Sequence, residues 1–235
     1  MRYRKYSEYQ TTDIKELRPK DSYKNLILKR THTIDGLIKK YGRIPADLLV
    51  KRDCPICKSQ DYSNVLNKDY LTIVKCNKCN MVYTNPIFDE EHYLKAYSSV
   101  DYQNIVKELG EKSHEYRVKR FGDERVSYLK NHLKEVQNIK HLDIGCSTGF
   151  VVEAAANEGW DSLGIDLNPS AIEFGRKRGL NLKNTSLEEL DTEIGNYNVI
   201  TLFDVLEHIH DPLILIKGYH LVFGTHQYFP SGFAF

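Results

Sequence analysis

The sequence predicts an α/β protein whose larger domain is built on a doubly wound parallel sheet. Two observations predict this class. Short apolar segments alternate with helical segments from residue 139 onward, and a glycine turn joins the first apolar segment to the first helix. A third observation, two Cys-x-x-Cys pairs upstream, predicts a small metal-binding ribbon before the sheet.

The first strand is expected at residues 139–144, a short apolar segment typical of a parallel strand buried on both faces. Gly145 and Gly149 follow it. A side chain at either position would block the close approach of a ligand or forbid the backbone dihedrals of the turn. Residues 150–156 are small and apolar and predict a helix that lies close to the sheet, with Gly159 placed to end it.

A second strand at residues 162–165 brings Asp166 to the carboxyl edge of the sheet, where ligands bind in this class of fold. Asp166 lies 17 residues after Gly149, close to the distance of about 20 at which an acidic residue binds a ribose diol. Ser147 replaces the second glycine of a dinucleotide-binding loop. Asp143, expected at the mouth of the loop, suits an ammonium group and would repel a diphosphate.

The alternation continues after Asp166. Asn168 is a good N-cap and Pro169 suits the first position of a helix over residues 171–178, which Gly179 would close. Further elements are expected at 180–183 (strand), 186–190 (turn) and 197–203 (strand).

Three motifs together resemble those of class I S-adenosylmethionine-dependent methyltransferases. They are Asp143-Ile-Gly-Cys-Ser-Thr-Gly149, Asp166-Leu-Asn-Pro169 and Phe203-Asp-Val-Leu-Glu-His-Ile-His-Asp-Pro212. The resemblance implies a Rossmann-like fold, S-adenosyl-L-methionine as cofactor and methyl transfer as the reaction. The residues it places around the cofactor are Asp143, Gly145, Cys146, Ser147 and Gly149 at the methionine end, Asp166 at the ribose, Leu167, Ser186 and Leu187 near the adenine, and Phe203 at the end of the fourth strand.

His208 is the candidate catalytic base, with His210 as a second candidate, because imidazole titrates near neutral pH. A base is needed only if the acceptor must lose a proton, and the same pair can simply close the pocket. Asp204, Glu207 and His208 also suggest a divalent-ion site. Cys146, the odd cysteine, is better explained by its small size than by its reactivity.

Cys54, Cys57, Cys76 and Cys79 form two Cys-x-x-Cys pairs separated by 18 residues, the spacing of a structural four-thiolate zinc site. Strands are expected at residues 70–75 and 81–86. Two disulfides or a degenerate ribbon without metal are the alternatives. Residues 1–10 are polar and basic, unlike a secretory signal, so a cytoplasmic location with reduced thiols is expected.

The charge is uneven along the chain. Residues 1–52 carry a net charge of +8 and the remainder −7, although the total is only +1. We expect four segments: a basic arm with an amphipathic helix (1–50), the zinc ribbon (51–86), a helical connector (87–138) and the cofactor domain (139–235). The connector should hold a short helix at 90–97 and a longer one at 111–133. Tyr93, Tyr97 and Tyr102 would form a packing stripe or line a substrate mouth.

Three functions fit these features. The first is methyl transfer to a small-molecule or sugar-type acceptor, such as a sugar nucleotide or a polysaccharide precursor. The second is an RNA methyltransferase that binds its substrate through the ribbon and the basic arm. The third is a non-catalytic zinc module with a vestigial cofactor domain. Only 23 residues follow Pro212, so the cofactor domain is expected to be truncated, with a sheet that stops near the fourth strand. No apolar run is long enough to span a membrane.

Overall fold

The computed structural model describes residues 12–18, 34–89, 91–92, 95, 99–187, 189–190 and 196–213. The chain divides into two compact units, which are described separately. The first comprises Met1–Leu26 and Gln103–Phe203, and the second comprises Ile27–Tyr102 and Asp204–Phe235.

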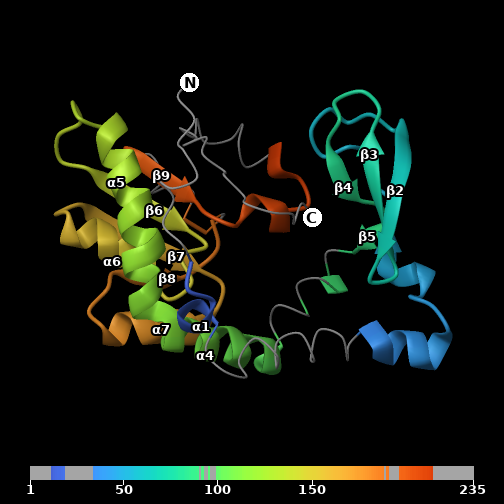
Figure 1. The fold of residues 1–235 in the computed structure, drawn as a ribbon, viewed down its shortest axis with the longest axis horizontal. Helices are drawn as coiled ribbons and strands as arrows, with labels where there is room; N and C mark the ends of the chain where they lie inside the picture. The colour runs from blue at the N-terminus through green and yellow to red at the C-terminus, as the bar shows by residue number, and fades with distance from the viewer. Residues whose placement is uncertain are drawn as a thin grey trace. The chain divides into compact units, whose positions relative to one another are not determined.

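The first unit holds a four-stranded parallel sheet (Figure 1). Its strands are β6 (Lys140–Ile144), β7 (Asp161–Asp166), β8 (Leu182–Asn184) and β9 (Val199–Leu202), in the spatial order β8-β7-β6-β9. The chain therefore winds outward from β6 in both directions, as a doubly wound sheet does. The expected α/β class is confirmed, and β6 ends at Ile144 as its apolar pattern predicts.

Two strands start later than the sequence predicts. The third was expected from Leu180, but the N–H of Leu180 bonds to the carbonyl of Gly175 and closes the preceding helix, so β8 starts only at Leu182. The fourth was expected from Tyr197, yet β9 begins at Val199. Hydrogen bonding at a helix end, invisible to apolar periodicity, sets the start of β8.

Helices α6 (Phe150–Asn157) and α7 (Pro169–Lys177) follow β6 and β7 and pack on the sheet. The Asn168 side chain accepts hydrogen bonds from the N–H groups of the first turn of α7, and Pro169 occupies its first position. Gly159 and Gly179 follow the two helices with φ of +80° and +85°. The predicted caps of both helices are confirmed.

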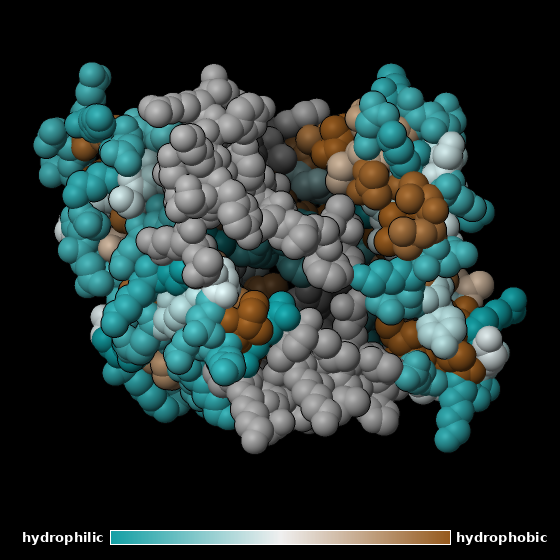
Figure 2. Space-filling view, viewed as in Figure 1, coloured by the Kyte–Doolittle hydropathy of each residue, from teal (hydrophilic) through white to brown (hydrophobic). Residues whose placement is uncertain are grey.

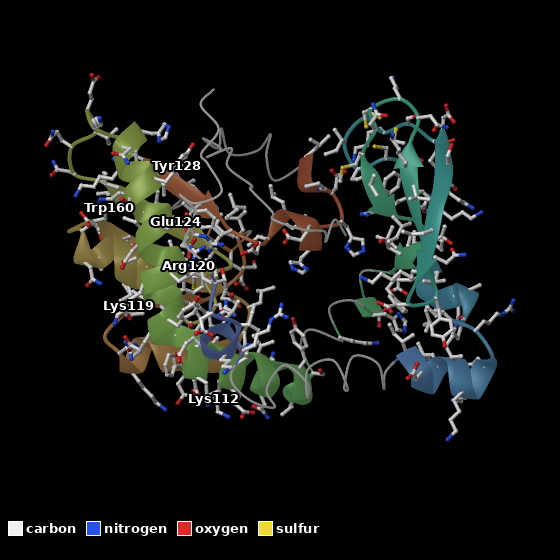
Figure 3. All side chains as sticks on the ribbon, in the orientation of Figure 1. Lys112, Lys119, Arg120, Glu124, Tyr128 and Trp160 are labelled. Atoms are coloured by element: carbon white, nitrogen blue, oxygen red, sulfur yellow. The ribbon has the colours of Figure 1, made fainter. Side chains whose placement is uncertain are left out.

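The helical segment before the sheet differs from its prediction. A helix was expected over residues 111–133, whereas α4 spans Val100–Arg117 and continues through a π-helical turn at Val118–Gly122 into α5 (Asp123–His132). Lys112 and Arg120 form ion pairs with Glu108 and Glu124, one helical turn away (Figure 3). Charged residues therefore continue the helix on the N-terminal side of the apolar positions from which it was predicted. Ion pairs near the surface stabilise a helix only weakly.

The core of the first unit lies between these helices and the sheet. Val126, Phe150, Val151, Ala155 and Trp160 are among its buried members. Gly122 packs so closely on α6 that an added Cβ would lie 2.7 Å from the carbonyl oxygen of Phe150. Small residues on both sides, Gly122 and Ala154 of α6, thus permit this close approach of the two helical segments.

The second unit contains a three-stranded antiparallel sheet of β2 (Tyr62–Lys68), β3 (Leu71–Cys76) and β4 (Val82–Thr84). A second pair joins β1 (Leu49–Val50) to β5 (Ile87–Phe88), and a short 3-10 turn (η2, Ala46–Leu48) precedes β1. The predicted strands at 70–75 and 81–86 are present with shifted bounds, because Tyr70 adopts a left-handed turn conformation with φ of +64°. Strand β2 was not predicted.

Apolar side chains gather on the surface of this unit (Figure 2). Val65, Leu66 and Tyr70, at the β2–β3 end, are about half exposed or more. They show why β2 was missed: its buried and exposed positions do not alternate, so it lacks the period-two pattern that identifies a strand.

Several predictions fall wholly or partly outside the described residues. Of the basic arm, the structure describes α1 (Ile14–Leu17) and helical residues 34–41. The helix at 90–97 is mostly outside, as are Tyr93 and Tyr97, whereas Tyr102 lies in α4. The tail after residue 213, on which the predicted truncation depends, also lies outside. Among the described residues, no helix combines the length and apolarity that a bilayer crossing requires.

Candidate functional site

A glycine loop joins β6 to α6 at the carboxyl edge of the sheet. Gly145, Ser147 and Gly149 adopt left-handed conformations with φ of +73°, +52° and +83°. The N–H groups of Gly145 and Cys146 bond to the carbonyl of Ile165 on the neighbouring strand β7. The predicted conformational need for glycine at positions 145 and 149 is confirmed. Ser147 adopts the same left-handed backbone conformation although it carries a side chain.

Asp166 ends β7 beside this loop. Its two carboxylate oxygens accept hydrogen bonds from the N–H groups of Ser147 and Asn168, each at 2.8 Å. Burial raises the pKa of Asp166, and those two N–H groups oppose the rise. An ionised carboxylate has about four lone-pair positions, so two backbone donors leave capacity for a diol. The structure thus brings Asp166 to the loop, as the sequence predicted.

Asp143 lies deeper than predicted. It was expected at the mouth of the loop, but it is only 3% exposed. The Thr201 hydroxyl, on the neighbouring strand β9, donates to its Oδ1 at 2.6 Å. Burial raises the pKa of Asp143 to about 7, against the lowering effects of Thr201 and Arg125. Asp143 precedes the loop by two residues, and the body of the sheet therefore shields it from solvent.

Cys146 packs into the core, and its thiol is 1% exposed. An added Cβ on Gly164 of β7 would lie 2.7 Å from its Sγ, so there is little spare room around the sulfur. Burial raises the pKa of Cys146, which keeps the thiol protonated and unreactive. These observations support the sequence-based explanation that size selects this residue.

The remaining predicted cofactor residues follow the carboxyl ends of β7, β8 and β9 in the chain. Leu167 is 61% exposed beyond Asp166, while Leu187 is buried. The Asn184 side chain at the end of β8 bonds to the backbone carbonyl of Asp166, which ties the segment before Ser186 to β7. Phe203, next to the end of β9, packs against the core under the guanidinium of Arg125, 4.2 Å from its ring centroid.

His208 lies in the second unit, in a 3-10 turn (η5, Leu206–His208), and is exposed. Its neighbour His210 bonds through Nε2 to the carbonyl of Phe88, and the carbonyl of His210 accepts from Arg52. These contacts hold residues 204–213 against the ribbon. The structure therefore groups His208 with the ribbon unit.

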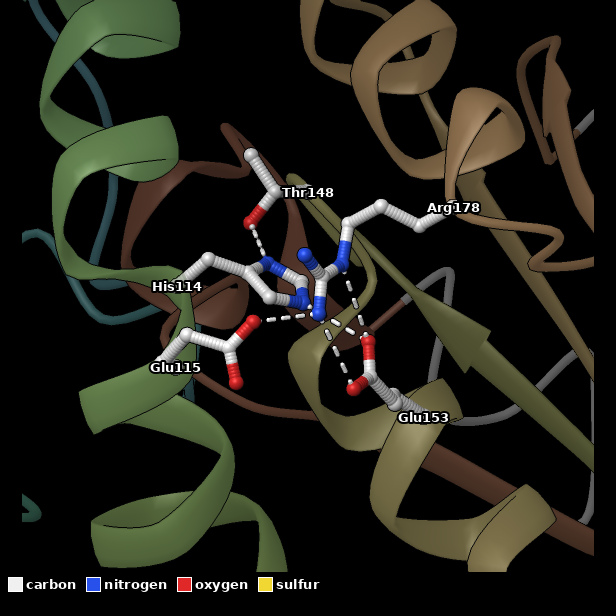
Figure 4. Close-up of polar contacts among 5 residues, drawn as sticks. All are labelled: His114, Glu115, Thr148, Glu153 and Arg178. Carbon is white, nitrogen blue, oxygen red and sulfur yellow. Dashed lines mark hydrogen bonds and ion pairs between the residues drawn. The ribbon is translucent and has the colours of Figure 1, made fainter.

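A buried polar cluster that the sequence did not indicate fixes the loop from the helical side (Figure 4). His114 of α4 is 1% exposed, and its Nδ1 and Nε2 lie 2.9 Å from the Thr148 hydroxyl and the Glu153 carboxylate. Arg178 adds ion pairs to Glu153 and Glu115. No sequence signal links a helix position to a loop 34 residues away.

A second missed contact involves His141, which bonds to Thr201 and to Ser162. A signal was present here. His141 and Asp143 are two residues apart on one strand and therefore face the same side of the sheet.

The four predicted metal ligands converge in the second unit. The Sγ atoms of Cys54, Cys57, Cys76 and Cys79 all lie within 4.8 Å of one another, and all four are free thiols. Two pairs are 3.5 Å apart. Tetrahedral zinc with Zn–S bonds of about 2.3 Å requires sulfurs about 3.8 Å apart, so this cluster fits the ion.

The two Cys-x-x-Cys loops share one backbone conformation. Lys58 and Asn80, each directly after the second cysteine of a pair, have φ of +57° and +63°. Their N–H groups bond to the carbonyls of Cys54 and Cys76, which closes each loop. The N–H of Cys79 lowers the pKa of Cys76 to about 6, a shift toward the thiolate form that a metal binds.

Among the described residues, the four cysteines are the one group whose atoms could hold a metal. Asp204, Glu207 and His208 do not converge in this way, so the suggested divalent-ion site is not supported. The alternative of two disulfides is also not supported, because every cysteine is free.

Residues 114–223 match the family profile described as "Methyltransferase domain", and the fold, the glycine loop and Asp166 are the features that the resemblance to class I S-adenosylmethionine-dependent methyltransferases implies. The chain is similar to the ubiquinone biosynthesis O-methyltransferase of Acinetobacter baylyi, with 28% identity over 127 residues that cover 47% of this chain and 53% of that protein. The corresponding protein of Bordetella avium is 32% identical over 101 residues, 40% of this chain and 42% of the relative. The chain thus spans about half the length of these curated relatives.

Solved structures that match part of this chain include the plantazolicin methyltransferase BpumL in complex with SAH. The two chains share 21% identity with a TM-score of 0.41, over 54% of this chain and 50% of that one. A structure titled "Conversion of a Disulfide Bond into a Thioacetal Group during Echinomycin Biosynthesis" has 24% identity and a TM-score of 0.33, over 40% and 41% of the two chains.

Proposed function

We propose that this protein binds S-adenosyl-L-methionine and transfers its methyl group to a small-molecule acceptor. The observation that carries the proposal is the position of Asp166, whose half-buried carboxylate ends β7 and bonds to the N–H of Ser147 in the glycine loop. A carboxylate beside a left-handed glycine turn suits a ribose diol next to a closely approaching ligand.

The chain's own residues supply three parts of the proposed site. Asp166 would hold the ribose, Asp143 the ammonium of the methionine part, and Leu167 the adenine, with Ser186 and Leu187 at its edge. When bound, S-adenosyl-L-methionine supplies a methyl group already activated by its positive sulfur. The protein's contribution is then to orient the acceptor and to exclude water.

His208 remains the proposed base for an acceptor that must lose a proton. An exposed imidazole can accept a proton from a bound hydroxyl. A hydroxyl acceptor bound near His208 would give a rate that rises as the imidazole loses its proton. Replacement by alanine should lower the turnover number without changing cofactor affinity, and an unchanged turnover number would exclude this role.

The acceptor is proposed to be a small molecule with a hydroxyl group. Support comes from the relatives, which are named as O-methyltransferases of ubiquinone biosynthesis. A sugar nucleotide or polysaccharide precursor is a second acceptor of the same kind. An RNA acceptor has only the net charge of +8 on residues 1–52 in its favour, and binding that weakens steeply with salt would support it.

We also propose that Cys54, Cys57, Cys76 and Cys79 bind one structural Zn²⁺. With four protein sulfurs around the ion, no position is open for a catalytic water. Thiols that converge in one cluster instead of pairing as disulfides favour a reducing compartment such as the cytoplasm.

Native mass spectrometry of the purified protein with added S-adenosylhomocysteine tests both binding proposals at once. We expect one Zn²⁺ and one S-adenosylhomocysteine per chain. A zinc-loaded protein that takes up no S-adenosylhomocysteine would contradict methyl transfer and favour a non-catalytic zinc module.

A further inference from the structure

A continuous chain of hydrogen bonds crosses the centre of the parallel sheet and ends at Asp143. The Ser162 hydroxyl on β7 lies 2.7 Å from Nδ1 of His141 on β6, and Nε2 of His141 lies 2.8 Å from the Thr201 hydroxyl on β9. Thr201 then bonds to Asp143 at 2.6 Å. All four residues are buried.

The hydrogens in this chain have one consistent order. A carboxylate accepts only, so the single hydroxyl hydrogen of Thr201 points to Asp143. Thr201 must then accept from Nε2–H of His141, and Nδ1 of His141 must accept from Ser162. The ring stays neutral because burial lowers its pKa to about 4, and the edge of Trp160, with ring centroids 5.7 Å apart, covers it.

Such a chain is costly in a sheet core. Apolar residues of similar size would avoid the desolvation of three polar side chains. If one hydrogen bond in the chain were not formed, the buried polar group left unpaired would cost more free energy than a formed bond contributes. The chain connects to one charged group only, the carboxylate proposed to bind the cofactor ammonium. Among the described residues, Thr201 is the one hydrogen-bond donor to Asp143.

We propose that Thr201 is a positioning residue for the cofactor, and that His141 fixes the direction of its hydroxyl so that Asp143 stays ionised with Oδ1 occupied and Oδ2 available for the ammonium group. This inference rests on the proposed function. A hydrogen bond donated to a carboxylate favours its charged form, so Thr201 stabilises the charge that burial would otherwise remove.

The surroundings of Asp143 contain two further charged groups. Burial is the largest influence and raises the pKa of Asp143 to about 7, and Asp166 raises it further. Thr201 and the guanidinium of Arg125 on α5 lower it. Since Asp166 also titrates near the cofactor, a test must separate the two carboxylates.

Two ligands distinguish the effect of Asp143 from that of Asp166. S-adenosylhomocysteine carries the amino acid, whereas 5′-methylthioadenosine has the same adenosine and thioether without it. Affinities of both are measured from about pH 5 to 8, where neutral His141 does not change charge, for the wild type, Thr201→Val and Thr201→Ser. Thr72→Val, on the ribbon, is the matched control, because it removes an exposed threonine hydroxyl that bonds to Asn67.

In the wild type, affinity for S-adenosylhomocysteine should fall as the pH drops through about 7, because Asp143 becomes protonated. Thr201→Val should shift this midpoint upward by about one pH unit and weaken binding at pH 7 about fivefold, since a hydrogen bond to a charged group is lost. Thr201→Ser and Thr72→Val should behave as the wild type. Affinity for 5′-methylthioadenosine should be the same in all four proteins.

An unchanged midpoint in Thr201→Val would overturn the inference, as would an equal loss of both ligands, which indicates a purely structural role. Wild-type protein that binds neither ligand would instead refute the proposed cofactor function. If Thr201→Val does not fold, Thr201→Ala replaces it. That change also removes the hydroxyl that donates to Oδ1 of Asp143, so the midpoint should again rise. Nitrogen NMR of the wild type should show His141 protonated at Nε2, and protonation at Nδ1 would overturn the inference.

Discussion

At the scale of single residues, the site depends on backbone conformations and on one buried charge. Gly149 has φ of +83° and is the N-cap of α6, and side-chain atoms of Leu180 and Leu182 lie 3.0 Å from where its Cβ would be. Two separate constraints, conformation and space, therefore exclude a side chain there. Burial of Asp143 favours its neutral, protonated form over the charged carboxylate.

Gly149→Ala should lower the free energy of unfolding by more than Gly179→Ala does. Both positions have positive φ, which costs a side chain about 1–2 kcal/mol, but nothing lies within 4 Å of an added Cβ at Gly179. Crowding against the two leucines should add about 1 kcal/mol at Gly149. Urea denaturation of the two variants measures the difference, and equal losses would contradict the crowding.

Asp143→Asn should stabilise the protein at neutral and alkaline pH. The folded pKa of Asp143, about 7, lies above its ordinary 3.8, so the folded state binds the proton more tightly than the unfolded state. The charge thus costs stability, progressively between those values and fully above the higher one, by about 2–4 kcal/mol. Denaturation curves should differ most near pH 8 and converge in acid. A variant that is less stable at pH 8 would show that the carboxylate is not strained.

At the scale of elements, helix α4 is joined to the glycine loop through His114 and a close approach at Gly110. An added Cβ on Gly110 would lie 2.7 Å from Cγ2 of Thr148. Burial lowers the pKa of His114 although Glu153 raises it. The neutral ring can therefore bond to Thr148 and Glu153 together, and these bonds fix the glycine loop relative to α4.

His114→Leu should destabilise the first unit by about 2–3 kcal/mol, because it leaves the buried Thr148 hydroxyl without its partner and removes one of the bonds to Glu153, which keeps Arg178. His132→Leu on α5 is the matched control, since that ring is exposed and its loss should cost less than about 0.5 kcal/mol. Amide hydrogen exchange should show faster opening at the glycine loop in the first variant only. Equal exchange in both would refute the connection.

The elements also show what the sequence could and could not predict. Gly145, Gly149, Asn168 and the four cysteines were found because each acts through local backbone geometry or fixed spacing. The start of α4, strand β2 and the partners of His114 were missed because tertiary contacts decide them. His141 lies between these cases: its place on the strand was predicted, but its bonds to β7 and β9 need the sheet order.

At the scale of the whole molecule, two compact units divide the proposed tasks. The parallel sheet carries the proposed cofactor residues, and the cysteine cluster holds the small antiparallel sheet together. The hydrophobic core of this sheet is small and consists of Val74, Tyr83 and the cysteines themselves. A sheet with so few apolar residues needs another source of stability, and the proposed metal would supply it.

Removal of zinc by a strong chelator, or Cys76→Ser, should therefore unfold the second unit at a lower temperature. Calorimetric melting should show two transitions, of which only the ribbon transition moves, because the ligand set of the metal lies within that unit. Added Zn²⁺ should restore the wild type after chelation but not the variant. Purified protein without zinc and with unchanged melting would contradict the structural metal site.

Calorimetric titration with S-adenosylhomocysteine, of the wild type and of Asp166→Asn, tests the central claim most directly. We expect one binding site in the wild type and affinity weakened about 10- to 100-fold in Asp166→Asn, because a charged hydrogen-bond acceptor for the ribose is lost. The variant should keep the wild-type melting temperature of the ribbon unit. Absence of binding heat in the wild type, or equal affinity in the two proteins, would contradict the assignment of this edge of the sheet as the cofactor site.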